Sequence, residues 1–196
     1  CLGYISTGAA TSGFYPILAA VLFIYLFGGL YMGRFKDKFK PDIFCDDVYT
    51  LDIECLKKIG IKAIIFDIDN TLVTYDDLKA PEHTKKWFEM LHQNNILTCL
   101  VSNNNKERVE NFAKSLNEPY FYAALKPKKK YIIKACDVIG VSPNEAALVG
   151  DQLFTDIYGG NRLGMYTIMV KAISDKENWF VHFKRSLEKY FLKEWF

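Results

Sequence analysis

Four short apolar runs, each followed by polar side chains, constrain the fold of this 196-residue chain more than any other feature. They are rich in β-branched and aromatic residues and cover residues 63–66, 97–101, 120–123 and 147–149. Such runs are typical of buried parallel strands, whose carboxyl ends meet at the ligand-binding edge of an open sheet. Helical patterns alternate with them, which predicts a doubly wound α/β sheet. The expected helices cover residues 48–58, 81–93, 106–117, 127–139 and 155–163, and a fifth strand is expected at residues 165–170.

The composition predicts one globular domain. Half of the residues are apolar, which is enough for a sizeable core in a chain of this length. The net charge of +2 is too small to indicate a nucleic-acid partner. The five cysteines form no Cys-x-x-Cys pair, so we expect free thiols in a reducing compartment.

Two carboxylates, Asp67 and Asp69, follow the first run two residues apart. At the carboxyl edge of a sheet, one can attack phosphorus while the other protonates the leaving oxygen and later activates water. On its own this pair is weak evidence for phosphoryl transfer, because Asp-x-Asp also occurs in calcium-binding loops and in plain turns. Ser102 follows the second run and Lys126 the third, so a hydroxyl and an ammonium are expected at the same edge.

A metal site is predicted at this edge as well. Asp151 ends the fourth run, and Asp156 lies five residues later. Together with Asp67, these acids offer hard oxygen ligands for one Mg²⁺ ion.

These residues resemble the four motifs of the haloacid dehalogenase-like (HAD) phosphatase superfamily, in the expected order over about residues 62–170. Within it, residues 69–73, 101–104, 150–157 and 159–164 are similar to capless phosphatases that include bacterial and mitochondrial phosphatidylglycerophosphatases. The resemblance implies a HAD-like, Rossmann-like fold. It also implies a Mg²⁺-dependent phosphatase that converts phosphatidylglycerophosphate to phosphatidylglycerol in phospholipid biosynthesis.

The resemblance further implies a role for each site residue. Asp67 is the expected nucleophile, which forms an aspartyl-phosphate, and Asp69 is the expected general acid and base. Four residues are expected to bind the phosphoryl group: Ser102, Asn103, Lys126 and Thr71. Four are expected around Mg²⁺: Asp67, Asp69 through its backbone carbonyl, Asp151 and, as an outer carboxylate, Asp156.

The spacing of the motifs leaves no room for a cap domain. Asp67 and Ser102 are 35 residues apart, Ser102 and Lys126 are 24 apart, and each gap already holds one helix and one strand. An open site suits a substrate too large to enclose, such as a lipid headgroup at a membrane or a phosphorylated macromolecule. Two function classes stay open: a lipid phosphatase at a membrane, and an interaction module or a phosphatase acting on proteins or soluble esters.

The amino-terminal segment of residues 1–33 carries no charged side chain, and residues 14–32 have about the length that spans a hydrocarbon core. Four basic residues follow within residues 34–40. By the positive-inside tendency, the domain of residues 34–196 is then expected at the cytoplasmic face of a membrane, or on the matrix side in a mitochondrion. The alternatives are a signal peptide, a lipid-modified first cysteine, or a translated stretch upstream of a start at Met32.

Two further features bear on membranes. Residues 128–130 are three lysines in the first turn of a predicted helix, where cations oppose the helix dipole. A solvated charge run and attraction to an anionic lipid surface explain them equally well. The aromatic stripe within residues 179–191 favours core packing over a membrane-surface face.

Overall fold

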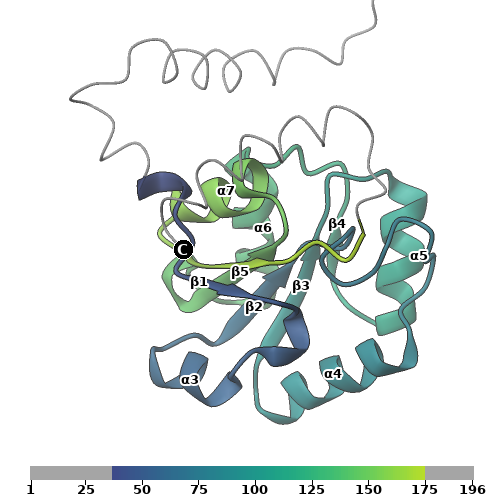
Figure 1. The fold of residues 1–196 in the computed structure, drawn as a ribbon, viewed down its shortest axis with the longest axis horizontal. Coiled ribbons are helices and arrows are strands. Elements are labelled where there is room, and N and C mark those ends of the chain that lie inside the picture. Colours follow the sequence, from purple (N-terminus) through teal and green to yellow (C-terminus); the bar gives the residue numbers. More distant parts are fainter. Residues whose placement is uncertain (1–36, 175–196) are drawn as a thin grey trace, which may run out of the picture. The chain divides into compact units, whose positions relative to one another are not determined.

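The computed structural model describes residues 37–174, and from Lys38 onward its elements belong to one compact α/β unit (Figure 1). Six parallel strands form one sheet in the order β1-β6-β5-β2-β3-β4. The strands are β1 (Ile43–Cys45), β2 (Ala63–Phe66), β3 (Leu97–Val101), β4 (Tyr120–Phe121), β5 (Ala146–Gly150) and β6 (Tyr166–Val170). The doubly wound parallel sheet predicted from the sequence is confirmed.

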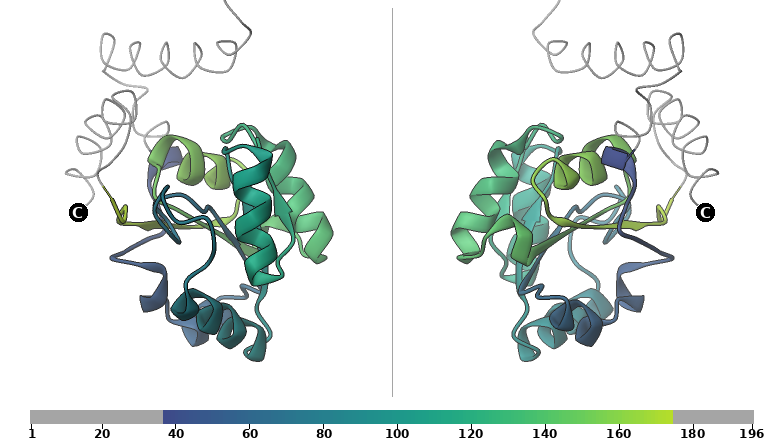
Figure 2. Two further views of the ribbon diagram at one scale, coloured as in Figure 1. Left: turned by 90° about the vertical axis from the view of Figure 1, so that its right-hand side faces the viewer. Right: turned by 90° about the vertical axis from the view of Figure 1, so that its left-hand side faces the viewer.

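Helices cover both faces of the sheet (Figure 2). The helices are α3 (Ile53–Lys58), α4 (Glu82–Gln93), α5 (Lys106–Leu116), α6 (Lys129–Ile139) and α7 (Tyr158–Asn161). Shorter turns are η1 (Asp37–Phe39), η2 (Val48–Thr50), η3 (Pro143–Glu145) and the π-helical η4 (Leu153–Ile157). Along β2, Ile64 and Phe66 pack in the core that holds α3, α4 and α5, whereas Ala63 and Ile65 pack in the core that holds α6. Because both faces of β2 are buried, its sequence is continuously apolar.

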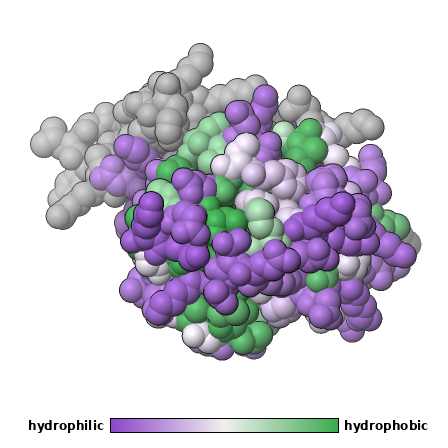
Figure 3. Space-filling model, turned by 90° about the horizontal axis from the view of Figure 1, so that it is seen from below, coloured by the Kyte–Doolittle hydropathy of each residue, from purple (hydrophilic) through white to green (hydrophobic). Residues whose placement is uncertain are grey.

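In contrast to the apolar core, the outer surface of the unit is mostly hydrophilic on the face that Figure 3 shows. On the side of α3 and α4, hydrophilic residues cover most of the surface and hydrophobic residues show in smaller areas between them (Figure 3). On α4 the apolar residues Trp87, Phe88 and Leu91 are buried, so the helix turns one stripe inward.

Three elements differ from the sequence prediction. The helix expected over residues 48–58 is divided into η2 and α3, because the side chains of Asp47 and Asp52 each accept backbone hydrogen bonds and start a new turn. The helix expected over residues 155–163 begins earlier, as η4. Strand β1 was not predicted, since three residues are too few to establish a period.

The sequence expectations about the two ends of the chain lie outside the described residues. These are the apolar segment of residues 1–33 and the stripe within residues 179–191. Within residues 37–174, no helix has both the length and the apolarity needed to cross a membrane. The four cysteines of this range, Cys45, Cys55, Cys99 and Cys136, are free thiols.

A buried acid lies where β3 and β4 begin. Glu118 is 7% exposed, and its two oxygens meet the Thr98 hydroxyl at 2.6 Å and His92 Nε2 at 3.1 Å. Burial raises the pKa of Glu118 to about 7, although the hydrogen bond from Thr98 offsets part of the rise. At neutral pH this carboxyl group therefore carries a proton in a substantial part of the folded molecules.

We expect Glu118 to make the stability of the protein fall as pH rises from about 4.5 through about 7. In this window the folded state holds more protons on Glu118 than the unfolded state does, so deprotonation favours unfolding. Glu118→Gln should remove this dependence, a difference on the order of 1–3 kcal/mol between pH 5 and pH 8. Urea unfolding at both pH values measures it, with the exposed Glu89→Gln as control; an unchanged pH dependence in Glu118→Gln would contradict the assignment.

Candidate functional site

The carboxyl ends of β2, β3 and β5 and the loop after β4 surround a cavity of about 230 Å³. Its lining residues are Asp67, Asp69, Tyr75, Ser102, Asn103, Asn104, Lys126, Gln152 and Thr155. Five residues predicted from the sequence are among them: Asp67, Asp69, Ser102, Asn103 and Lys126. The other three, Thr71, Asp151 and Asp156, are buried and do not line the cavity.

Lys126 links two of the acids. Its Nζ lies 2.7 Å from Asp67 Oδ1 and 2.7 Å from Asp156 Oδ1. The Lys126 side chain is only 1% exposed, so the ammonium is withdrawn from water and depends on these two carboxylates for its stabilisation. Lys126 also lines the cavity, where its charge can help to balance that of a phosphoryl group.

The position of Lys126 is fixed through its backbone. Lys126 N donates to Asn103 Oδ1 at 2.6 Å, and Asn103 Nδ2 donates to Lys126 O at 3.2 Å. Ala124 N donates to Ser102 O at 3.0 Å, which joins the loop after β4 to the end of β3. Leu125 has a left-handed backbone with φ of 54°, which is uncommon for a residue with a side chain. The Asn103 amide, expected to bind phosphate, thus holds the lysine in the described structure.

Three carboxylates gather beside this lysine. Asp67, Asp151 and Asp156 each offer an oxygen, and these oxygens lie within 4.8 Å of one another. The Thr71 hydroxyl, expected to bind phosphate, donates to Asp151 Oδ1 at 3.3 Å, and Gln152 N donates to Asp156 Oδ2 at 3.2 Å. Three buried carboxylates against one ammonium leave an excess of negative charge, and their oxygens are the ligands that Mg²⁺ prefers. The donor set therefore fits a divalent cation.

The charges of this cluster alter its ionisation. Burial raises the pKa of Asp67 well above its usual range; the Lys126 ammonium lowers it in part, and the neighbouring Asp156 and Asp151 carboxylates raise it further. Burial also acts to lower the pKa of Lys126, but Asp156 and Asp67 outweigh it and leave that pKa raised. A carboxyl group can act as a nucleophile only in its carboxylate form, and a further cation beside Asp67 would favour that form.

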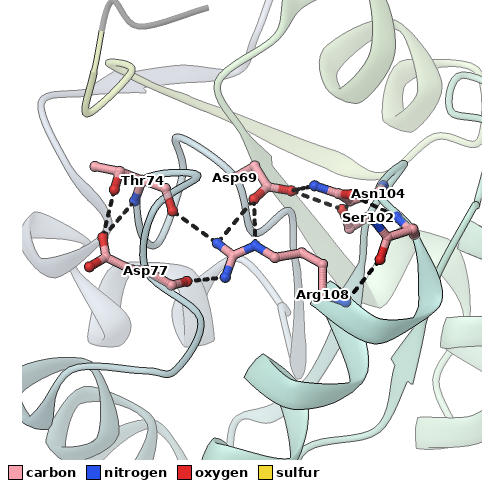
Figure 4. A network of polar contacts seen from close by, with 7 residues as sticks. Asp69, Thr74, Asp77, Ser102, Asn104 and Arg108 are labelled. Atoms are coloured by element: carbon pink, nitrogen blue, oxygen red, sulfur yellow. Dashed lines mark hydrogen bonds and ion pairs between the residues drawn. The ribbon is translucent and has the colours of Figure 1, made fainter.

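Asp69 belongs to a second, separate network (Figure 4). Its Oδ1 lies 3.1 Å from Arg108 Nη2 and 3.2 Å from Arg108 Nε. Its Oδ2 accepts hydrogen bonds from Asn104 Nδ2 at 3.1 Å and from Ser102 Oγ at 3.4 Å. The partners of the Asp69 carboxylate thus differ from those of the three clustered carboxylates, and the Ser102 hydroxyl contacts it directly.

Arg108 and Asn104 were not predicted as site residues. Arg108 lies in the first turn of α5, where a cation opposes the helix dipole, and it is only 6% exposed. An arginine in an unfavourable helical position that is also buried requires an anionic partner. The place of Arg108 in the first turn of a helix could be predicted from the sequence, but the burial of its side chain could not.

These groups together suit phosphoryl transfer. Asp67 presents a carboxylate at the cavity, Asp69 presents a second one, and Ser102 and Lys126 supply donors for phosphoryl oxygens. The cavity is smaller than the roughly 300–1,000 Å³ of sites that enclose a whole small molecule. It therefore has room for a phosphoryl group, while a large substituent would extend beyond it.

Comparison with known proteins supports this chemistry. Residues 34–173 match the model of a family described as mitochondrial PGP phosphatase. The probable phosphatase YqeG of Bacillus subtilis is 36% identical over 154 residues, 79% of this chain and 90% of that protein. Phosphatidylglycerophosphate phosphatase 1 of Arabidopsis thaliana is 29% identical over 79% of this chain and 47% of its own length. The phosphatidylglycerophosphatase GEP4 of Saccharomyces cerevisiae is 28% identical over 57% of this chain and 68% of its own length.

We expect Gly150→Ala to disturb the acidic cluster selectively. A Cβ at Gly150 would lie 2.3 Å from Asp156 Cγ, so Asp156 must move away from Lys126. The free energy of unfolding should fall by about 1–3 kcal/mol, and added Mg²⁺ should stabilise the variant less than the parent. Chemical unfolding with and without Mg²⁺ measures both effects.

Gly164→Asn is the matched control for this substitution. A Cβ there meets nothing within 4 Å, and asparagine tolerates the left-handed φ of 70°. An alanine variant at position 150 that matched the parent in both measurements would contradict the packing of Asp156 against Gly150.

Proposed function

The chain belongs to the PGP phosphatase family and is a phosphoric monoester hydrolase of the HAD type, and we propose that it removes the terminal phosphate of phosphatidylglycerophosphate with Mg²⁺ as cofactor. The single observation that carries this proposal is the small cavity in which the Asp67 carboxylate, the Asp69 carboxylate and Lys126 meet. The product would be phosphatidylglycerol, which places the reaction in phospholipid synthesis.

The reaction proceeds in two steps on this chain's own residues. Asp67 attacks phosphorus, the ester P–O bond breaks, and Asp69 gives its proton to the leaving oxygen. Water then attacks the aspartyl-phosphate, passes a proton to Asp69 and frees Asp67 together with inorganic phosphate. Ser102 and Lys126 hold the transferring oxygens throughout, and Lys126 stays paired with Asp156 on its far side.

For Mg²⁺ we propose three protein ligands and one carboxylate that does not bind the ion directly. The carboxylates of Asp67 and Asp151 and the backbone carbonyl of Asp69 would hold the ion, with Asp156 behind them. When bound, the ion offsets negative charge on the transferring phosphoryl group. It also compensates the excess of carboxylates over ammonium groups around Lys126.

The open surroundings of the cavity support a large substrate. Residues 67–81 between β2 and α4, and residues 122–128 between β4 and α6, hold no helix or longer strand, so no lid domain interrupts the sheet in the described part of the chain. The phosphoryl group is then bound inside and the remainder of the molecule outside. A lipid headgroup meets this requirement, because its acyl chains can stay in the bilayer.

The proposal is tested by phosphate release from phosphatidylglycerophosphate in mixed micelles, compared with glycerol 3-phosphate and other soluble phosphate esters. We expect hydrolysis that requires Mg²⁺ and prefers the lipid. Asp67→Asn should lower turnover by at least about 1,000-fold, because the amide cannot serve as nucleophile. Its folding should stay intact, as judged by circular dichroism.

Two results would overturn parts of the proposal. Equal or faster hydrolysis of soluble esters would remove the lipid assignment and favour another phosphorylated substrate. Turnover retained by Asp67→Asn would remove the nucleophile assignment.

We also propose that the loop after β4 meets an anionic membrane surface, at the cytoplasmic face or the matrix face according to the organism. Leu125 is 58% exposed and Tyr122 is 41% exposed, next to Lys126 in the chain. Lys128 and Lys130 are exposed directly after them. Apolar side chains beside cations are typical of surfaces that contact anionic lipid headgroups.

Replacing Lys128, Lys129 and Lys130 by Gln should weaken binding to phosphatidylglycerol-containing vesicles by at least about 10-fold, because each lysine near the surface contributes attraction. Turnover of a small soluble ester should change much less. Vesicle co-sedimentation and ester hydrolysis measure the two effects. The control replaces Lys57, Lys58 and Lys62, which precede β2 at the opposite edge of the sheet and are also exposed. Equal loss in the control would contradict a specific surface.

A further inference from the structure

One guanidinium group binds both the second carboxylate of the site and the loop beside it. Arg108 contacts Asp69 Oδ1 through Nη2 at 3.1 Å and Nε at 3.2 Å. Its Nη2 also donates to Thr74 O at 2.9 Å, and its Nη1 donates to Asp77 O (Figure 4). The donors of one buried side chain are thus shared between a carboxylate and two backbone carbonyls.

Helix stability does not explain this arginine. Arg108 is the third residue of α5, where a cation costs about 0.3–1 kcal/mol against the helix dipole. Its guanidinium is also buried, which is unfavourable without complete pairing. The helix start is already satisfied by Asn105, whose side chain accepts a hydrogen bond from the backbone N–H of Arg108. The position of the Arg108 side chain therefore follows from what it binds.

The two carbonyls bound by Arg108 bracket the segment that carries Tyr75. Tyr75 lines the cavity together with Asp69. The segment is closed on itself, because the Asp77 carboxylate accepts from Thr74 N at 3.2 Å and from Thr74 Oγ1 at 2.7 Å. Moving the guanidinium would therefore displace the Asp69 carboxylate and this wall of the cavity together.

The two oxygens of Asp69 have different surroundings. Oδ1 faces the guanidinium, whereas Oδ2 faces Ser102 Oγ at 3.4 Å and Asn104 Nδ2 at 3.1 Å. Ser102 and Asn104 line the cavity, and Arg108 does not. Oδ2 is thus the oxygen on the side where a leaving group can approach.

We propose that Arg108 is a positioning residue for proton transfer: it fixes Asp69 through Oδ1 so that Oδ2 delivers the proton to the leaving oxygen, and it holds the Tyr75 segment beside that leaving group. This role rests on the phosphatase chemistry proposed above. In the step concerned, an oxygen of Asp67 forms a bond to phosphorus while the ester P–O bond breaks and its electron pair stays on the leaving oxygen. Asp69, protonated on Oδ2, gives its proton to that oxygen and becomes a carboxylate, and the water that later attacks the aspartyl-phosphate returns a proton to it.

The test uses the leaving group as its readout. An alkoxide such as that of glycerol 3-phosphate needs a proton to depart, whereas p-nitrophenolate departs without one. The kcat/KM for each ester covers the steps up to release of the leaving group and is independent of later hydrolysis of the aspartyl-phosphate. Damage to the fold or to phosphate binding would lower kcat/KM equally for both esters. Loss of proton delivery lowers kcat/KM only for the alkyl ester, glycerol 3-phosphate.

For Arg108→Gln we expect kcat/KM to fall about 100-fold on glycerol 3-phosphate and less than about 5-fold on p-nitrophenyl phosphate. Asp69→Asn should give the same split. The double variant should lose little more than either single variant, because both changes remove the same proton transfer. Lys114→Gln, an equal change of charge on the exposed side of α5, should leave both values unchanged.

Equal losses on the two esters would overturn the proposal, and so would additive losses in the double variant. Should Arg108→Gln not fold, Arg108→Lys retains the charge and the aliphatic stem but cannot form the planar fork, and it should show the same split. A lack of preference for the lipid substrate would bear on the proposed function alone, since both esters of this test are soluble.

Discussion

The buried contact of Lys126 with Asp67 and Asp156 is the interaction on which the site depends. Carboxylates at the ends of neighbouring parallel strands repel one another, and without a cation between them the carboxyl edge of the sheet would be electrostatically unfavourable. The ammonium lies 2.7 Å from an oxygen of Asp67, which follows β2, and 2.7 Å from an oxygen of Asp156 in η4, which follows the neighbouring strand β5. A single cation does not balance three carboxylates, so the charge and the ligand oxygens of the cluster suit a further cation.

The charged groups of the site form two networks of ion pairs, one around Lys126 and one around Arg108. Lys126 contacts Asp67, the proposed nucleophile, and Arg108 contacts Asp69, the proposed acid and base. The segment from Ser102 to Asn105 joins them: Asn103 holds the backbone of Lys126, Asn104 holds Asp69, and Asn105 caps the helix that carries Arg108. Three consecutive asparagines thus connect the two networks through hydrogen bonds of their side chains.

The sequence predicted those residues whose positions follow from the ends of strands. Asp67 and Ser102 directly follow buried strands, and parallel pairing brings such positions to one edge. Lys126 lies beyond the end of β4, and its place at this edge also depends on its contacts with Asn103. What the residues contact depends on loop conformation, which local periodicity does not encode. The binding of Asn103 to a backbone and of Arg108 to a carboxylate 39 residues away could therefore not be read from the pattern. Strand β1 was missed for a related reason, since its place at the edge depends on pairing with β6.

The absence of an inserted lid in the described residues bears on the fate of the phosphoryl group in the proposed reaction. An aspartyl-phosphate is an activated acyl phosphate, and enzymes that pass such a group to a chosen alcohol close over it to keep water out. In residues 37–174 no inserted domain lies between the strands, so the proposed intermediate would be open to attack by water from this side. In the proposed reaction this openness favours release of the group as inorganic phosphate over its transfer to another alcohol. Such a site suits a hydrolase and does not suit an enzyme that passes the group to a second substrate.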